Sequence, residues 1–339
     1  MCAKLNSSVA VHRLAADLHL RASETPVLAV FGYCHRKIRK LLRDYGTCST
    51  LAELLALLAN KLGTRLIEIN SDEELRDLQS QYVSRGELIF ALLDQELAGS
   101  ENYGITLKLQ SPASWEQPYV SIIDCRGRKW QRRYHTKWHE LGHLLILTDQ
   151  TRLAFRRSHD TAHPKSAEES LVDSIAGEIS FYPDLVAPHL GGKISFERIE
   201  ELRRSLCPEA SMYSAVLNLS RLWPSPCIWI EAQLAVKKKD ENVLQQSFQF
   251  RNPPQKTLRA VHTSANEAAR ERGLGIIPRF RVPKSSVINQ VFEQGLSFDE
   301  AYEDLDWWES SDGTRLGPCR VHVCAKRIGE SIHALVVPS

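Results

Sequence analysis

Apolar positions in the first third of the chain follow helical spacing and then strand spacing. Residues 10–24 and 35–62 predict two helices, and Gly63 marks the end of the second. The stretches TRLIEI, ITLKLQ and YVSIID predict short strands, whereas ELIFALLD fits either a strand or a helix. This part of the chain therefore predicts helices combined with a small mixed sheet.

Three further helices are predicted in the middle of the chain, at about residues 134–148, 167–181 and 195–223. The pattern changes near Pro224, where the strand-like stretch CIWIEAQLAVKK begins. We therefore expect a first domain over residues 1–222 and a second over residues 223–339.

The second domain combines short apolar segments with two predicted helices, near residues 264–272 and 285–294. The C-terminal stretches CRVHVCAKR and IHALVV predict a β-hairpin with Gly329 in its turn. Cys319 and Cys324 are five positions apart, so strand alternation places them on opposite faces and makes them a poor metal-binding pair. The overall expectation is an α+β protein of two domains.

Composition restricts the possible functions of the chain less than the pattern of apolar and polar residues does. A formal charge of +2 provides no global field for nucleic acid, so such binding would need a local patch. The 8 cysteines form no C-x-x-C pair, which favours free thiols in a reducing cytoplasm. The N-terminus has no long apolar h-region and no apolar run is long enough to span a membrane, so we expect a cytoplasmic protein.

The helix predicted over 134–148 contains the motif H-E-x-x-H, at His139, Glu140 and His143. Histidines four apart project from one helix face and can bind one Zn²⁺, while Glu140 can act as general base on the attacking water. The alternative is an apolar core helix with hydrogen-bonded histidines.

A third ligand is expected in the next helix, because catalytic zinc sites use three protein ligands. Glu169 and Asp173 share one helix face, so Glu169 can bind the metal and Asp173 can orient a ligand histidine. Ser166 and Glu169 also form a capping box, in which Glu169 would only cap the helix. Glu168 is then a rival ligand, and Asp173 is another.

These motifs together resemble the ImmA/IrrE family of gluzincin-like metallopeptidases, over about residues 50–222. Val172 departs from the family pattern, which usually has a small residue there, and one extra residue precedes Pro183. The positions that match are Thr136, His139, Glu140, Gly142, His143, Glu169, Asp173, Ala176, Glu178 and Pro183.

The resemblance implies a zincin-like fold and regulatory proteolysis. Such enzymes cleave a partner helix-turn-helix transcriptional repressor and so induce a DNA-damage, stress or phage-defence response. Some, including the CapP type of phage-defence islands, add a C-terminal GAF-like sensor domain, which fits residues 223–339. The rival function is a peptidase-like regulator that binds a repressor or nucleic acid without cutting. An intact Glu140 argues against that rival, because a binding module has no need of a base.

The segment before the motif suggests two forms of control. Cys125 ends the stretch YVSIIDC, which we expect to be an edge strand along the cleft, and its thiolate could occupy the fourth metal position and keep the enzyme latent. The basic run that follows has interleaved aromatic residues, which suits single-stranded DNA as an activator; the alternative is a solvated loop or a surface for an acidic substrate. The candidate contacts are Arg126, Arg128, Lys129, Trp130, Arg132 and Arg133.

Overall fold

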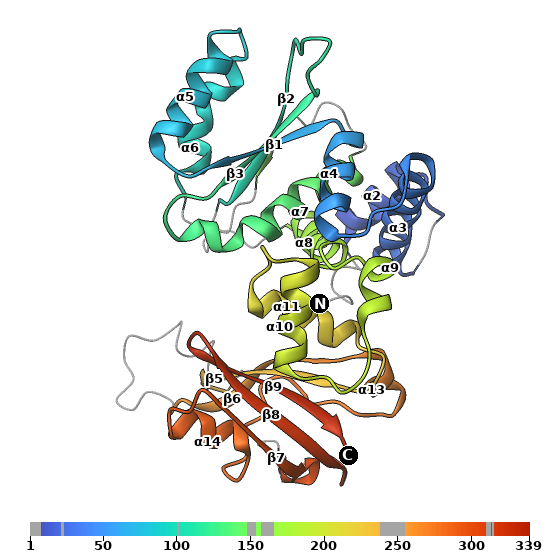
Figure 1. Cartoon of the computed structure of the whole chain (residues 1–339), viewed down its shortest axis with the longest axis vertical. Coiled ribbons are helices and arrows are strands. Elements are labelled where there is room, and N and C mark those ends of the chain that lie inside the picture. The colour runs from blue at the N-terminus through green and yellow to red at the C-terminus, as the bar shows by residue number, and fades with distance from the viewer. Residues whose placement is uncertain are drawn as a thin grey trace. The chain divides into compact units, whose positions relative to one another are not determined.

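The computed structural model describes residues 8–21, 24–99, 102–147, 154–156, 166–237, 255–309, 313 and 315–339. The fold is α+β, as predicted, with two separate sheets (Figure 1). The chain forms two compact units, the first of residues 1–185 and 206–211 and the second of residues 186–205 and 212–339. None of the described helices is long and apolar enough to cross a membrane.

The first unit holds most of the helices. In chain order its elements are α2 (Val9–Asp17), α3 (Pro26–Tyr45), α4 (Leu51–Lys61), β1 (Thr64–Ile69), α5 (Asp72–Val83), η1 (Leu88–Leu92), α6 (Leu93–Leu97), β2 (Gly104–Lys108), β3 (Tyr119–Asp124), η2 (Gly127–Arg132), α7 (Arg133–Leu145), β4 (Ala154–Arg156), α8 (Ala167–Ile179) and, at its boundary, α9 (Pro183–Val186).

The three predicted strands of this unit are present, whereas the first two predicted helices are divided differently. The helix expected over 35–62 is two helices, α3 and α4, because Gly46 follows α3 with a φ of 110°, a conformation that favours glycine and ends a helix. The helix expected over 10–24 ends at Asp17. The ambiguous stretch ELIFALLD forms the short helical elements η1 and α6.

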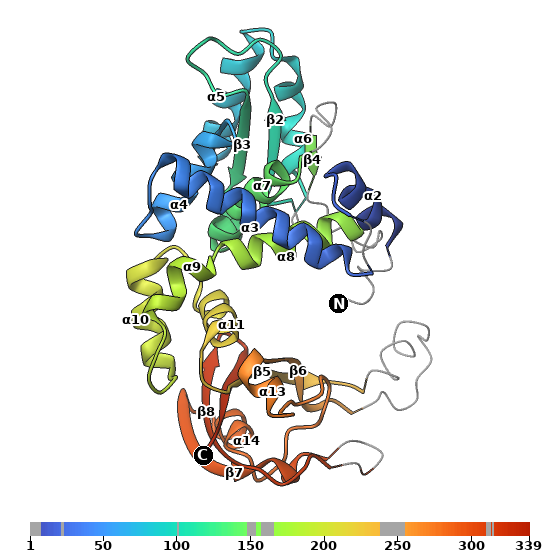
Figure 2. The ribbon, with the colours of Figure 1, turned by 90° about the vertical axis from the view of Figure 1, so that its right-hand side faces the viewer.

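The sheet of the first unit has the strand order β1-β3-β2-β4. Strand β3 pairs in parallel with β1 and antiparallel with β2. One face carries Ile105, Leu107, Val120 and Ile122, which form a core with α5 and α6. Helix α7 contacts β2 and β3, and α8 packs against α7 and runs beside α3 (Figure 2).

The second unit is built on one antiparallel sheet. In chain order its elements are η3 (Ala187–His189), α10 (Phe196–Leu206), α11 (Met212–Leu222), β5 (Ile228–Ala235), β6 (Thr257–Ala265), α13 (Glu267–Glu271), α14 (Val287–Glu293), β7 (Phe298–Asp304), η4 (Leu305–Trp307), β8 (Arg320–Ile328) and β9 (Ser331–Pro338).

The strand order of this second sheet is β6-β5-β9-β8-β7, and the predicted hairpin is β8 and β9, with Gly329 at a φ of 62° in the turn. Strands β6 and β7 were not predicted from the sequence. The division of the chain also differs from the expected boundary at residue 222. Residues 186–205 and 212–222 belong to the second unit, and the contacts of α11 with β5 and β6 explain the second of these segments.

His333, on β9, is buried as a neutral side chain and makes the second unit sensitive to acid. It is 1% exposed, and Trp229 Nε1 donates to its Nδ1 at 3.3 Å. Burial lowers the pKa of His333 from 6.5 to about 4, although the charge of Glu231 partly opposes this. Below the ordinary histidine pKa the unfolded chain therefore binds a proton that the folded chain excludes.

Lowering the pH is accordingly expected to destabilise the second unit. Between about pH 7 and about pH 5, His333 alone should remove about 2 kcal/mol of its free energy of unfolding. Denaturant unfolding followed by tryptophan fluorescence at the two pH values measures this. The His333→Gln variant can still accept from Trp229 and should show a flatter pH dependence; an equally steep one would contradict the assignment.

Candidate metal centre

Helix α7 carries both histidines of the H-E-x-x-H motif on a buried face. His139 and His143 are 0% and 2% exposed, and their Nε2 atoms lie 3.1 Å apart. Gly142 lets α8 approach this face, since a Cβ there would lie 3.2 Å from Val172 Cγ1. Val172, the departure from the family pattern, thus fills the space beside Gly142.

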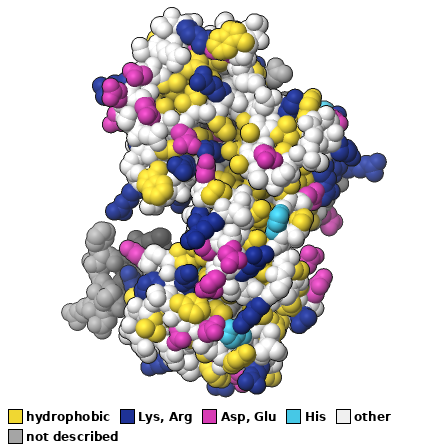
Figure 3. Space-filling view, viewed as in Figure 1, with side chains coloured by type: hydrophobic (Ala, Val, Ile, Leu, Met, Phe, Trp, Pro, Cys, Tyr) yellow, Lys and Arg dark blue, Asp and Glu magenta, His cyan; other side chains and the backbone are white. Residues whose placement is uncertain are grey.

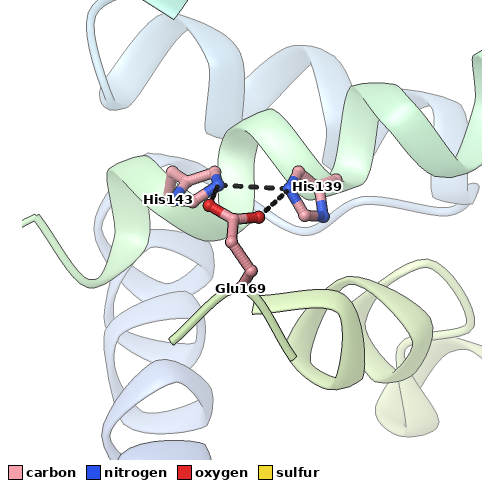
Figure 4. A group of neighbouring side chains, drawn as sticks. All are labelled: His139, His143 and Glu169. Carbon is pink, nitrogen blue, oxygen red and sulfur yellow. Dashed lines mark hydrogen bonds and ion pairs between the residues drawn. The ribbon is translucent and has the colours of Figure 1, made fainter. Parts of the chain in front are cut away.

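Glu169 reaches the two histidines from the first turn of α8. The N-cap of this helix is Ser166, whose Oγ accepts from the Glu169 N–H at 3.0 Å. The Glu169 carboxylate turns instead to the histidines, with Oε2 3.2 Å from His139 Nε2 and Oε1 3.3 Å from His143 Nε2 (Figure 4). Glu169 therefore lies at the site expected of a third ligand, and Glu168 is not part of this group.

The two ring nitrogens and the carboxylate oxygens that face them have spacings close to those around a Zn²⁺ ion. Metal–ligand bonds of about 2.0–2.2 Å at tetrahedral angles separate neighbouring ligand atoms by roughly 3.3 Å. Asp173 Oδ1 lies 2.7 Å from His139 Nδ1, so the proton on Nδ1 leaves the lone pair of Nε2 facing Glu169. Within the described residues, Glu169 Oε2 is buried and accepts no hydrogen bond. Two acceptors facing each other in this way fit a cation between them, and the donor set fits zinc.

The two carboxylates of the site differ in their electrostatics. Burial alone would raise the pKa of Glu169, but positive charge on the adjacent imidazoles, in the place that a bound cation would take, outweighs it and holds that pKa far below its usual value. Glu140, which is 1% exposed, has its pKa raised by burial, and the two histidines reduce this effect only in part. One carboxylate is thus suited to bind a cation, and the other to take up a proton.

A chain of hydroxyl groups crosses the sheet and ends at Glu140. Thr106 donates to Glu140 Oε2 at 2.7 Å, and its Oγ1 lies 2.7 Å from Ser121 Oγ, which in turn lies 2.8 Å from Thr64 Oγ1. These residues belong to β2, β3 and β1 and are all buried. None of the three residues was predicted from the sequence, although polar positions within otherwise apolar strands were a visible signal. This series of hydroxyl groups holds the Glu140 carboxylate in one orientation.

Removing the Thr106 hydroxyl should slow any reaction that uses Glu140 as a base. A hydrogen bond to a charged group contributes about 1.5–3 kcal/mol, so Thr106→Val is expected to reduce turnover roughly 10- to 100-fold. Thr106→Ser keeps the hydroxyl and serves as the matched control. Turnover and bound metal are measured together; equal turnover in the two variants would show that the hydroxyl is not needed.

Helix α3 contacts both helices of the site, α7 and α8, through side-chain hydrogen bonds. His35 Nε2 lies 2.6 Å from Glu178 Oε1 on α8, and Lys37 donates to the Leu145 carbonyl at the end of α7 at 3.0 Å. Glu178, which matches the family pattern, thus pairs with α3 and does not belong to the ligand group.

Cys125 directly follows β3, and its thiol contacts Glu68 and not the ligand group. Its Sγ donates to Glu68 Oε2 at 3.9 Å, and it is not among the grouped ligands. Burial, with the charge of Glu68, raises the pKa of this thiol to about 11. The expectation of an edge strand is wrong as well, because β3 is paired on both sides, by β1 and β2. The structure therefore does not support Cys125 as a fourth ligand.

Cys125→Ser is accordingly expected to leave both basal turnover and metal content unchanged. The thiol and the ligand atoms are separate in the structure, so its removal opens no coordination position. Turnover without any activator, compared with the unmodified chain, measures this. A rise in basal turnover would instead restore the latency hypothesis.

Two residues of the basic run, Arg126 and Lys129, form ion pairs within the protein. Arg126 pairs with the buried Asp124 at 2.8 Å and with Asp72 at 2.6 Å, and Lys129 pairs with Asp124 at 2.7 Å. These ion pairs occupy two of the six predicted nucleic-acid contacts. Of the rest, Arg133 is partly buried, while the exposed side chains are those of Arg128, Trp130 and Arg132. On the face in Figure 3, basic and acidic side chains are interspersed.

Comparison with known proteins does not assign the chain to a family. No family model matches it, and no curated protein matches it. One solved structure, a Mycobacterium tuberculosis transcriptional regulator, aligns with 89% of this chain and 86% of its own, at 11% identity and a TM-score of 0.40. A likeness at that level indicates neither the fold nor the function.

Proposed function

We propose that the first unit is a zinc-dependent endopeptidase that makes a specific cut in a partner transcriptional repressor. One observation carries the proposal: two buried imidazole nitrogens and the Glu169 carboxylate converge at distances close to metal spacing, with Glu140 on the same helix turn as the histidines. A non-catalytic regulator would not need a buried carboxylate that is held beside the ligands by Thr106.

The proposed mechanism divides the work among few residues. His139, His143 and Glu169 hold the ion, which when bound supplies Lewis acidity toward a water molecule and a peptide carbonyl. Glu140 accepts the proton of the attacking water and returns it to the leaving amine. Because Thr106 donates to Oε2, we assign this proton transfer to Oε1. Asp173 keeps His139 Nε2 aimed at the ion.

The substrate and the signal follow from the family resemblance. We propose a helix-turn-helix repressor as the substrate, single-stranded DNA as the activator and a GAF-like sensor as the second unit. The exposed Arg128, Trp130 and Arg132 support the DNA contact, as phosphate and base partners. The five-stranded antiparallel sheet and its helices support a sensor-like unit.

The test is cleavage of a repressor encoded beside this protein. The purified chain, loaded with Zn²⁺, is incubated with that repressor, with and without single-stranded DNA at low salt, and the products are identified by mass spectrometry. We expect one cut that a chelator abolishes and added zinc restores. A metal-loaded protein that leaves the repressor intact in both conditions would overturn the proposal, and equal rates with and without DNA would overturn the activator alone.

A further inference from the structure

Three ligand-type side chains meet on one face of the second sheet. His322 and Cys324 are two positions apart on β8, so strand alternation directs them to the same face. Glu300 on β7 is the cross-strand partner of Cys324, which places its side chain directly beside the thiol. The β7–β8 register therefore brings a carboxylate, an imidazole and a thiol together.

The spacing of these groups matches metal coordination. Cys324 Sγ lies 3.3 Å from Glu300 Oε2 and 3.5 Å from His322 Nδ1, and His322 Nε2 lies 3.5 Å from Glu300 Oε2. One ring nitrogen lies within 4.8 Å of both other ligand atoms. Bonds of about 2.3 Å to sulfur and about 2.0 Å to nitrogen separate tetrahedral ligand atoms by roughly 3.6 Å.

The group is sheltered and still open to solvent on one side. Cys324 and His322 are 4% and 8% exposed, whereas the Glu300 side chain is 51% exposed. The Tyr302 ring lies 5.0 Å from that of His322. Lys193 and Glu197, of opposite charge, both act electrostatically on Cys324, so their effects on a bound cation oppose each other. The ion would enter past Glu300.

We propose that Glu300, His322 and Cys324 form a second metal site, for a thiophilic divalent cation such as Zn²⁺. A thiolate, a carboxylate and a neutral imidazole carry two negative charges, which balance a divalent ion; Cys324 releases its proton to solvent as the ion binds. Three protein ligands leave one coordination position open. The site is chemically distinct from the centre on α7 and α8, which has no sulfur ligand.

Cobalt substitution separates the two sites. The full chain is stripped with a chelator, given Co²⁺ or Zn²⁺ alone, dialysed, and analysed for bound metal and near-ultraviolet absorption. We expect two ions per chain and a thiolate-to-cobalt charge-transfer band. Cys324→Ser should hold one ion and lose the band, whereas His139→Ala should hold one ion and keep it. The readout is independent of any peptidase activity.

Two further variants make the result decisive. Glu300→Gln alters a half-exposed side chain, so the fold should persist. The Co²⁺ concentration needed to develop the band should rise by roughly 10-fold or more. Cys319→Ser removes a nearby thiol outside the group and should retain both ions and the band. A band that is missing from the unmodified chain, or that persists in Cys324→Ser, would overturn the proposal and leave a hydrogen-bonded polar cluster only.

Discussion

Replacing Glu140 with glutamine should reduce cleavage of the proposed repressor substrate by roughly 10²- to 10⁴-fold, the usual contribution of a general base. Glutamine has nearly the same shape and still accepts the Thr106 hydrogen bond, but its amide cannot take up the proton of water. His139, His143 and Glu169 are unchanged in this variant. Its metal content should therefore equal that of the unmodified chain.

The measurement pairs elemental analysis with single-turnover cleavage of the repressor. Glu168→Gln is the matched control, because it also converts a glutamate to an amide but lies outside the ligand group. We expect the control to cleave normally. If Glu140→Gln binds zinc and cleaves at the unmodified rate, Glu140 is not the base and the mechanism is wrong.

Loss of Glu169 should have the largest effect on metal binding in the first unit. Glu169→Ala leaves two imidazoles, which hold zinc far more weakly than a three-ligand site, so its dissociation constant should rise more than roughly 100-fold. Asp173→Asn keeps all three ligands but weakens the orientation of His139. We expect a rise of roughly 10- to 100-fold there, as for other residues that orient a ligand histidine.

Competition with a chromophoric chelator measures both constants and places the variants in order. Glu168→Gln, which changes the neighbouring rival, should bind as the unmodified chain does. To separate the second proposed site from this titration, each substitution is made in the Cys324→Ser background. Equal affinities for Glu169→Ala and Glu168→Gln would exclude Glu169 as a ligand.

The grouping of the first site was predictable because its signals are local. Helical periodicity alone directs His139 and His143 to one face, and Glu169 and Asp173 to one face of the next helix. What periodicity could not decide was whether Glu169 would cap α8 or face the histidines. The structure shows that Ser166 caps the backbone while the Glu169 carboxylate points the other way. Rotamer and packing decide that choice, and neither is visible in the sequence.

The remaining features depend on pairing between distant segments. Cys125 is near α7 in the sequence, yet the register of β3 with β1 places its thiol beside Glu68. The Glu300, His322 and Cys324 group requires β7, which the apolar pattern of the second half did not predict, because its strand is largely polar. The unit boundary likewise depends on where α11 packs, a long-range contact that composition does not reveal.

The contacts of helix α3 bear on where the proposed peptidase unit begins. The motifs and the family resemblance begin at about residue 50, so a shortened chain starting there would include every proposed ligand and the base. It would nevertheless lose His35 and Lys37, which tie α8 and the end of α7 to α3. The segment that holds the candidate ligands in place therefore extends N-terminal to the motifs, and α3 acts as a structural brace for the candidate metal centre.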